Sequence, residues 1–252
     1  MQIAGRNIDV VSTPALRHGA PTLVFLHEGL GSIELWRGFP QRVASLTGCG
    51  TVVFSRYGNG FSEVLHEPRA VDYMHHEALV ALPALLAELM VERPILVGHS
   101  DGASIALIYA SVFPDCVRAL VLEAPHVIVE DISVTSIAAI GEVYRTTPLR
   151  EKMARYHTDV DATFYGWNDI WLAPAFRSWS IAEMLPSIAA PALALQGVDD
   201  EYGTLAQLDL LARASGSTTD RLVLAKCGHA PHRDRAAFVE ATVAQWIVNV
   251  PD

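Results

Sequence analysis

A serine in a tight glycine turn is the first feature of this chain that points to chemistry. Residues 95–104 form a short apolar run that ends in Gly98-His99-Ser100-Asp101-Gly102 and continues into an Ala/Ile/Leu-rich helical pattern. The pattern G-x-S-x-G between a strand and a helix is typical of a turn that lifts a serine hydroxyl above the end of a sheet. A Cβ at either glycine is expected to collide with the neighbouring strand or helix. Ser100 is therefore predicted to be a nucleophile at a helix start, where free N–H groups favour negative charge.

A serine hydroxyl needs a base that accepts its proton and an acid that orients the base. Two later strand ends supply them. Asp200 follows the apolar run 192–196 in a Gly-Val-Asp-Asp turn, and His229 follows the last predicted strand in a Gly-His loop. The order Ser100, Asp200, His229 is the one expected for a serine on such a turn. We predict that these three residues are catalytic.

Neighbouring titratable residues compete for two of these roles. Asp199 and Glu201 flank Asp200, but the acid third after the turn glycine is expected to project back from the strand end. His232 lies three residues after His229, and the Arg-Asp that follows it indicates the start of the last helix.

Other polar residues near strand ends are predicted to have structural rather than catalytic roles. His99 lies inside the turn and is too constrained to reach the Ser100 hydroxyl. His27 follows a strand and is expected to support the next loop by hydrogen bonding. His126 either lines a pocket or is a hydrogen-bonded buried histidine, and we favour the second. Arg56 is expected to fix a loop by bonding carbonyls rather than to pair with a carboxylate.

Attack on a carbonyl group creates an oxyanion, which needs two hydrogen-bond donors. The N–H of Asp101, directly after the nucleophile, is the first predicted donor. The second is expected from the glycine-rich loop after the strand 22–26, where the N–H of Gly29 is our choice and that of Leu30 the alternative.

Strands and helices alternate along the chain and must position these residues. Strands are predicted at 8–12, 22–26, 51–55, 95–97, 117–122, 192–196 and 221–225, and helices at 35–47, 71–91, 100–111, 205–214 and 234–248. Such alternation predicts an α/β fold with a mostly parallel central sheet and helices on both faces. Residues 126–189 break it with short, aromatic-rich helical patterns. We expect a core of residues 1–125 and 190–252 and a helical lid subdomain at 126–189 over the strand ends.

Composition excludes several classes of function. The net charge of −10 argues against binding to nucleic acid or anionic membranes. Three scattered cysteines and the lack of an apolar leader or spanning segment favour a cytoplasmic protein. There is no Walker lysine, no helix-opening G-x-G-x-x-G and no H-x-x-x-H pair, so neither cofactor nor metal is predicted. The expected partner is a small-molecule substrate, and nothing in the sequence indicates an oligomeric state.

The assembled motifs resemble the α/β-hydrolase fold superfamily over essentially the whole chain. Besides the serine turn, the matching segments are 27–31 (His-Glu-Gly-Leu-Gly), 56–62 (Arg-Tyr-Gly-Asn-Gly-Phe-Ser), 197–200 (Gly-Val-Asp-Asp) and 228–229 (Gly-His). One position departs from the pattern, because the first loop usually opens His-Gly and here Glu28 replaces the glycine.

Ser-Asp-Gly at the turn is similar to the biphenyl-hydrolase-like, valacyclovir-hydrolase-type serine esterases. In their best-known member, which cleaves α-amino-acid esters, the acid after the nucleophile holds the ammonium of the substrate. The resemblance implies this role for Asp101, and Glu28, Asp101 and Glu123 would then form an acidic rim selecting a cationic ester. The alternative is that Asp101 only complements the helix dipole and that Glu123 bonds to loop backbone.

The sequence therefore predicts a serine hydrolase that cleaves a small carboxylic ester, including amino- or cation-bearing ones, through an acyl-enzyme. The predicted substrate-binding residues are Glu28, Leu30, Glu123, Trp167 and Trp171. The two tryptophans either line an apolar pocket or belong to a small core of segment 126–189. Two alternatives keep the fold: a hydrolase of a C–C bond in a vinylogous diketone, and a ligand-binding protein without catalysis.

Overall fold

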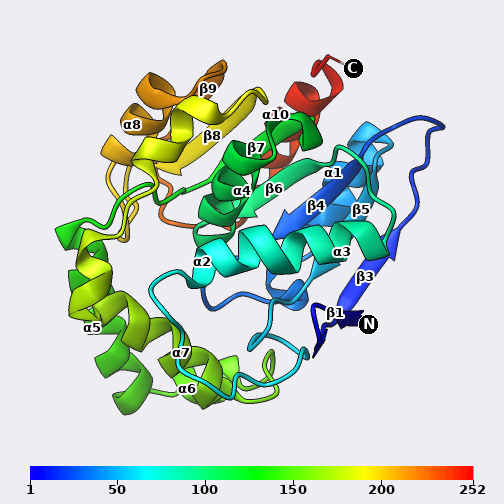
Figure 1. Cartoon of the computed structure of the whole chain (residues 1–252). Coiled ribbons are helices and arrows are strands. Elements are labelled where there is room, and N and C mark those ends of the chain that lie inside the picture. The colour runs from blue at the N-terminus through cyan, green and yellow to red at the C-terminus, as the bar shows by residue number, and fades with distance from the viewer. Residues whose placement is uncertain (252) are drawn as a thin grey trace.

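A seven-stranded sheet forms the centre of the computed structural model, which describes residues 1–251 (Figure 1). Its strands are β3 (Val10–Thr13), β4 (Thr22–Leu26), β5 (Gly50–Phe54), β6 (Ile95–His99), β7 (Ala119–Glu123), β8 (Ala192–Gly197) and β9 (Thr219–Leu224). They lie in the order β3-β5-β4-β6-β7-β8-β9, and only the edge pair β3–β5 is antiparallel. A separate hairpin pairs β1 (Gln2–Ile3) with β2 (Arg6–Asn7). The predicted mostly parallel sheet is confirmed.

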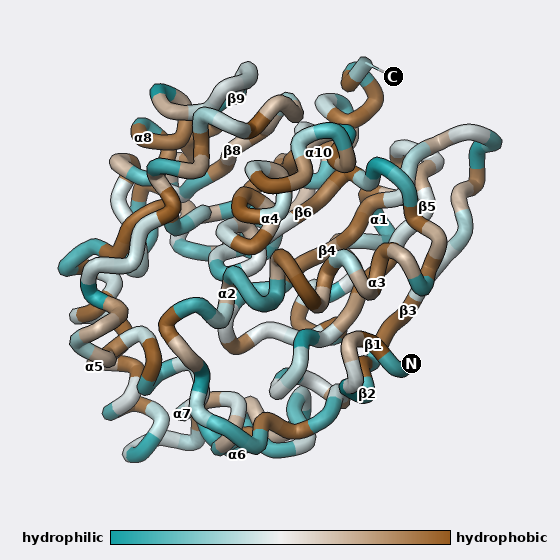
Figure 2. The backbone as a smooth tube through the Cα atoms, in the orientation of Figure 1, coloured by the Kyte–Doolittle hydropathy of each residue, from teal (hydrophilic) through white to brown (hydrophobic). Residues whose placement is uncertain are grey.

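The central strands are continuous apolar runs because both of their faces are covered. In register, Phe25 of β4 lies beside Val97 of β6, which lies beside Val121 of β7. All three side chains are fully buried. Figure 2 shows the same concentration of hydrophobic residues along β4, β6 and the helix that follows β6.

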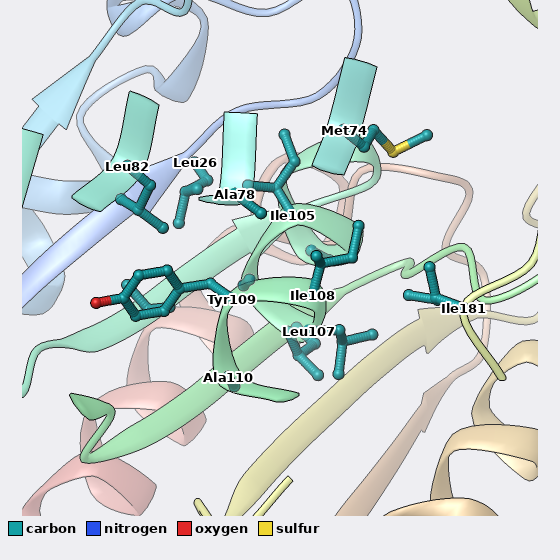
Figure 3. Packing of buried hydrophobic residues seen from close by; sticks show 14 of the residues in the cluster. Leu26, Met74, Ala78, Leu82, Ile105, Leu107, Ile108, Tyr109, Ala110 and Ile181 are labelled. Atoms are coloured by element: carbon teal, nitrogen blue, oxygen red, sulfur yellow. The ribbon is translucent and has the colours of Figure 1, made fainter. Parts of the chain in front are cut away.

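Helices cover both faces of the sheet, as the alternation predicts. One face carries α4 (Asp101–Val112), α2 (Tyr73–His76), the π-helical turn η2 (Glu77–Ala81), α3 (Leu82–Glu88) and α8 (Ala206–Ala214). The other carries α1 (Phe39–Thr47) and α10 (Ala236–Val248). Ile105 and Ile108 of α4 pack among Met74, Ala78 and Leu26 (Figure 3), which fixes the helix that begins at the serine turn.

Segment 126–189 consists of α5 (Asp131–Thr146), α6 (Leu149–Met153), α7 (Val160–Leu172) and the 3-10 turns η4 (Pro174–Ser178) and η5 (Ala182–Ser187). Within the described residues it adds no strand to the sheet, although Ile128 and Ser180 form an isolated bridge. Helices α5, α6 and α7 lie beyond the arrowheads of β4 and β6 in Figure 1. Its role as a lid, and the division of the chain into two parts, stay predictions.

Two predicted helices are interrupted in the structure. The helix expected at 35–47 begins at Phe39, after the 3-10 turn η1 (Ile33–Trp36), because Arg37 and Gly38 have φ values of +50° and +78°. The helix expected at 71–91 contains η2, which ends at Ala81, two residues before Pro83. Proline has no N–H to continue the helical hydrogen bonds. The remaining short helices are η3 (Pro114–Cys116) and α9 (Pro231–Asp234). No helix within residues 1–251 has the length and apolar character needed to span a membrane.

Candidate active site

Ser100 stands on a strained turn between β6 and α4, with φ +54° and ψ −118°. A Cβ on Gly98 would lie 2.6 Å from the Ala103 Cα atom, and one on Gly102 would overlap the Leu26 carbonyl. Both approaches involve backbone, so neither neighbour can move aside cheaply. The prediction that the turn requires both glycines because of close packing is confirmed.

Three strand ends bring a hydroxyl, an imidazole and a carboxylate into one row. Ser100 Oγ lies 2.9 Å from His229 Nε2, and His229 Nδ1 lies 2.8 Å from Asp200 Oδ1. Asp200 Oδ1 also accepts the N–H of Tyr202 at 2.8 Å, and its Oδ2 accepts the Gln196 side-chain N–H at 3.1 Å. The carboxylate is thus held on both oxygens, and the structure assembles the three residues named from the sequence.

The charge state of Asp200 sets the tautomer of the imidazole. Burial by itself would raise the pKa of Asp200, but the hydrogen bond and charge of His229 bring that pKa below its ordinary value. An ionised carboxylate only accepts hydrogen bonds, so His229 Nδ1 donates to it. His229 Nε2 is then free to accept the Ser100 hydroxyl proton, as a general base must.

The backbone of the histidine loop is fixed by two further carboxylates. Asp234 accepts the N–H of Gly228 at 2.8 Å, and Glu201 accepts the N–H of His229 at 3.3 Å. The His229 carbonyl in turn accepts the Nε2–H of His99 at 2.7 Å. The Glu201 carboxylate, which competed with Asp200 in the sequence analysis, therefore bonds to the backbone N–H of His229 and not to its imidazole.

His232 and Glu123 form a buried pair outside the reacting row. His232 Nδ1 lies 2.7 Å from Glu123 Oε2, which also accepts the His232 backbone N–H at 3.1 Å. The Glu123 side chain is fully buried, and the cavity beside Ser100 does not include it. The structure does not bring Glu123 to this cavity: its Oε2 is bonded to His232, and its Oε1 is buried without a partner among the described residues.

The Asp101 side chain points into the protein and not toward the cavity. Its Oδ2 accepts the Tyr73 hydroxyl at 2.6 Å and lies 3.6 Å from Arg56 Nη2. The Tyr73 oxygen also accepts the indole N–H of Trp171 at 3.1 Å. The structure does not present Asp101 to a substrate ammonium: its Oδ2 is already paired, its Oδ1 is buried without a partner among the described residues, and the residue is only 1% exposed. Of the expected acidic rim, Glu28 alone reaches the cavity.

Backbone N–H groups of the two loops beside Ser100 remain available. Within residues 1–251, no acceptor takes a hydrogen bond from the N–H of Gly29, of Leu30 or of Asp101. A Cβ on Gly29 would overlap the indole ring of Trp167, so only glycine fits beneath that ring. The N–H groups of Asp101 and Gly29, with that of Leu30 as the alternative to Gly29, are the ones predicted to bind an oxyanion, and that role stays a prediction.

The loop that carries Gly29 is held by hydrogen bonds from two buried side chains. His27 Nδ1–H donates to the Glu28 carbonyl at 2.6 Å, and His27 Nε2 accepts the Arg56 N–H at 2.9 Å. The Arg56 guanidinium donates to the same Glu28 carbonyl at 2.9 Å. Burial holds the pKa of His27 well below its ordinary value, consistent with this neutral tautomer. The predicted loop-supporting roles of His27 and Arg56 are seen in these bonds. The expectation that Arg56 does not pair with a carboxylate is wrong, because its Nη2 lies 3.6 Å from Asp101 Oδ2.

Glu28, the departure from the usual His-Gly, is paired with the histidine of the serine turn. Its Oε2 lies 3.4 Å from His99 Nδ1, while His99 Nε2 donates to the His229 carbonyl. Both ring nitrogens of His99 therefore face acceptors, which favours the doubly protonated ring. Burial opposes that charge, but the hydrogen bond and charge of Glu28 raise the pKa of His99 to about 9. The pair links the first loop, the serine turn and the histidine loop.

A cavity of about 390 Å³ opens beside Ser100 and His229. Of the substrate-binding residues still predicted, Glu28, Leu30, Trp167 and Trp171 line it. Sequence reasoning missed most of the remaining wall: Ile137, Ile140, Leu149, Met153, Glu201, Tyr202, Arg233 and Asp234. Ile137 and Ile140 lie three residues apart on the amphipathic α5, a spacing that places them on one helix face.

The family of the chain follows from its sequence profile and its fold together. The profile of the alpha/beta hydrolase fold matches residues 21–146. The chain belongs to this family. The predicted resemblance and fold class are thus confirmed.

Solved structures of hydrolases share the fold over nearly the full length. The enol-lactonase from Burkholderia xenovorans LB400 has a TM-score of 0.76, with 99% of each chain covered at 18% identity. A thermophilic esterase from Thermogutta terrifontis has a TM-score of 0.71 at 18% identity, covering 97% of this chain and 94% of its own. The meta-cleavage product hydrolase from Pseudomonas fluorescens IP01 has a TM-score of 0.72 at 12% identity, covering 98% and 96%.

A relative by sequence is Epoxide hydrolase 2 from Siraitia grosvenorii, 31% identical over 106 residues. The match spans 42% of this chain and 33% of that protein, so the chain aligns with about a third of the relative's length. Within residues 1–251, no three His, Cys, Asp or Glu side chains converge in a way that could hold a metal ion.

Proposed function

We propose that this α/β-hydrolase is a serine hydrolase that cleaves a small carboxylic ester through an acyl-enzyme. The observation that carries the proposal is the continuous row from Ser100 Oγ to His229 Nε2 at 2.9 Å and from His229 Nδ1 to Asp200 Oδ1 at 2.8 Å. A hydroxyl, a base and an ionised acid in this order are what covalent catalysis by serine requires.

In the proposed reaction, Ser100 Oγ attacks the ester carbonyl carbon while His229 Nε2 takes the hydroxyl proton. The developing oxyanion accepts hydrogen bonds from the N–H groups of Gly29 and Asp101, which bond to no other acceptor among the described residues. The C–O bond to the alcohol then breaks, and His229 gives that alcohol the proton. Water repeats the sequence on the acyl-enzyme, and Asp200 stays ionised throughout.

The lining of the cavity supports a substrate with an apolar group. Side chains of α5, α6 and α7, with Leu30, contribute apolar lining, and the 201 and 228–234 loops add charged residues to it. The pairing of Asp101 with Tyr73 removes the main support for an amino-bearing ester. A neutral ester with an apolar acyl or alcohol group fits the apolar part of this lining best.

The reactive groups favour a carbonyl substrate over an epoxide. Opening an epoxide with Ser100 would leave an ether, which water does not hydrolyse at neutral pH, so the enzyme would be consumed. An acyl-serine ester is hydrolysed by the same His229 that formed it. The epoxide hydrolysis that the name of the sequence relative indicates is therefore not proposed for this chain.

Labelling with a fluorophosphonate tests the proposal directly. We expect one adduct on Ser100 by intact and peptide mass spectrometry, and none in the Ser100→Ala protein. Release of acid from a panel of methyl and nitrophenyl esters, followed at constant pH, should show turnover that the same substitution abolishes. A folded protein with no adduct and no ester turnover would refute the proposal in favour of a ligand-binding role. Turnover of a ring-cleavage diketone but of no ester would instead favour the C–C hydrolase.

A further inference from the structure

His126 lies beside the row formed by Ser100, His229 and Asp200, and the proposed reaction does not use it. It follows β7, the strand next to the one that carries Ser100, and its carbonyl accepts the Ser104 hydroxyl at 2.7 Å. The next residue, Val127, donates its N–H to Gln207 at 2.7 Å. These two bonds anchor the backbone, so the place of the imidazole is fixed by the core of the fold.

The His126 ring is part of the cavity wall that also contains Ser100 and His229. Its centroid lies 5.6 Å from that of His229 and 5.0 Å from that of Trp171, which it meets edge-on. On the opposite flank of Ser100 is the Gly29 loop, because β7 and β4 lie on either side of β6. His126 therefore borders the site on the side away from the proposed oxyanion donors.

The imidazole has no hydrogen-bond partner among residues 1–251. Its Nδ1 is buried and unpaired, and no described group bonds to its Nε2, although the residue is only 3% exposed. Buried polar atoms in native proteins are nearly always paired, so an unpaired one at a cavity points to a ligand. Trp171, which the ring meets edge-on, and Ile137 are apolar residues of the same cavity lining.

The charge of His126 restricts what that ligand group is. Burial lowers the pKa of His126 to about 3, and the nearby His229 acts in the same direction. The ring is therefore neutral at neutral pH, with one nitrogen donating and the other accepting. An uncharged imidazole in an apolar wall matches a neutral oxygen, such as a hydroxyl, and gives a carboxylate or an ammonium no counter-charge.

We propose that His126 is a specificity residue that hydrogen-bonds an uncharged hydroxyl or carbonyl oxygen close to the scissile bond of the substrate. The inference rests on the proposed ester hydrolysis at Ser100 and narrows it to oxygen-substituted esters. The oxygen belongs either to the acyl part or to the alcohol part of the ester, and paired substrates distinguish the two.

The test compares esters that differ by one hydroxyl group. Methyl lactate against methyl propionate, and methyl β-hydroxybutyrate against methyl butyrate, place the oxygen on the acyl side. Ethylene glycol monobutyrate against propyl butyrate places it on the alcohol side. For each pair, the ratio of kcat/KM values is measured for the wild type, His126→Phe, His126→Gln and the control Ile137→Val. Dividing variant by wild-type ratios removes the intrinsic reactivity of each ester.

We expect His126→Phe to lower the hydroxy-to-plain ratio about 10-fold for one side of the ester, the value of a neutral hydrogen bond. His126→Gln should restore part of it, because an amide also donates and accepts. Ile137→Val, which trims the same wall without touching a polar atom, should change both members of each pair equally. Equal losses on both members for His126→Phe, with correct folding by circular dichroism, would overturn the inference.

A binding measurement separates this inference from the proposed function. In the Ser100→Ala background, calorimetry with the same esters reports recognition without turnover. Tighter binding of the hydroxy ester that disappears with His126→Phe supports the role of His126 even where the wild type shows no hydrolysis. Absence of any such preference overturns it, whereas missing turnover and missing fluorophosphonate labelling refute the proposed function alone.

Discussion

Replacing Glu28 by glutamine is expected to destabilise the fold in a way that depends on pH. The folded environment raises the pKa of His99 from its ordinary 6.5 to about 9, because Glu28 outweighs the effect of burial. A folded pKa above the unfolded one means that the stabilisation is complete below about pH 6.5 and is lost as the pH rises through 9. The difference between the two pKa values corresponds to about 3 kcal/mol. The side chain of His99 is 4% exposed and that of Glu28 is 24% exposed, so solvent screens the pair only in part.

Urea unfolding of the wild type and Glu28→Gln at pH 6 and pH 9 measures this contribution. We expect the variant to lose about 3 kcal/mol at pH 6 and less than about 1 kcal/mol at pH 9. Glutamine keeps the size of the side chain and an acceptor for His99, so the comparison reports the charge. Glu34→Gln, at an exposed position of η1, is the matched control and should show no such pH dependence.

A nearby buried pair does not confuse the comparison. Glu123 and His232 lie close to His99, whose ring centroid is 5.1 Å from that of His232, but both are unchanged in Glu28→Gln. Their contribution therefore cancels in the difference between variant and wild type. An equal loss of stability at pH 6 and pH 9 would refute the assignment of a charged His99, and would leave only a packing role for Glu28.

Further substitutions probe the proposed reaction and its supports. Asp200→Asn should lower kcat by about 10⁴-fold in steady-state ester assays with little change in the unfolding midpoint, because His229 then adopts the wrong tautomer. An activity within 10-fold of wild type would contradict the role of Asp200 in orienting His229. Gly29→Ala should lower kcat by about 10² to 10³, since the added methyl group meets Trp167 and displaces an oxyanion donor. The double variant Gly29→Ala/Trp167→Ala should recover much of this loss, and failure to do so would count against the steric cause. Tyr73→Phe should cost about 2 kcal/mol in urea unfolding because the Asp101 carboxylate loses a buried hydrogen bond, and a change below about 0.5 kcal/mol would contradict this account.

The reacting row was predictable because each member follows a strand end that the sequence marks locally. An apolar run followed by a glycine turn identifies Ser100 and Asp200 without knowledge of distant contacts. Parallel strands then bring their carboxyl ends to one edge, so the three segments meet. The interruption of the predicted helix at Arg37 was not predictable, because a left-handed φ at a non-glycine residue has no signature in composition.

The partners of the acidic residues were not predictable from the sequence either. Asp101, Glu123 and Glu28 all follow or approach strand ends, and local sequence gives the three no distinguishing mark. The fold places Tyr73 against the first and His232 against the second, whereas the third pairs with His99 and still lines the cavity. These pairings join residues separated by 28 to 109 positions, so only the tertiary structure decides which carboxylate reaches the cavity.

The two sides of the cavity are supported by different parts of the chain. The row of Ser100, His229 and Asp200 is fixed by strand ends, whereas the apolar wall comes from α5, α6 and α7. Substitutions in that wall can change the accepted ester without moving the reacting atoms. The contact of Trp167 with Gly29 links the two sides, because the indole lies on the loop whose N–H is proposed to bind the oxyanion. A displacement of α7 that moves Trp167 would therefore alter the oxyanion donor together with the pocket, and rate and specificity would change together at that residue.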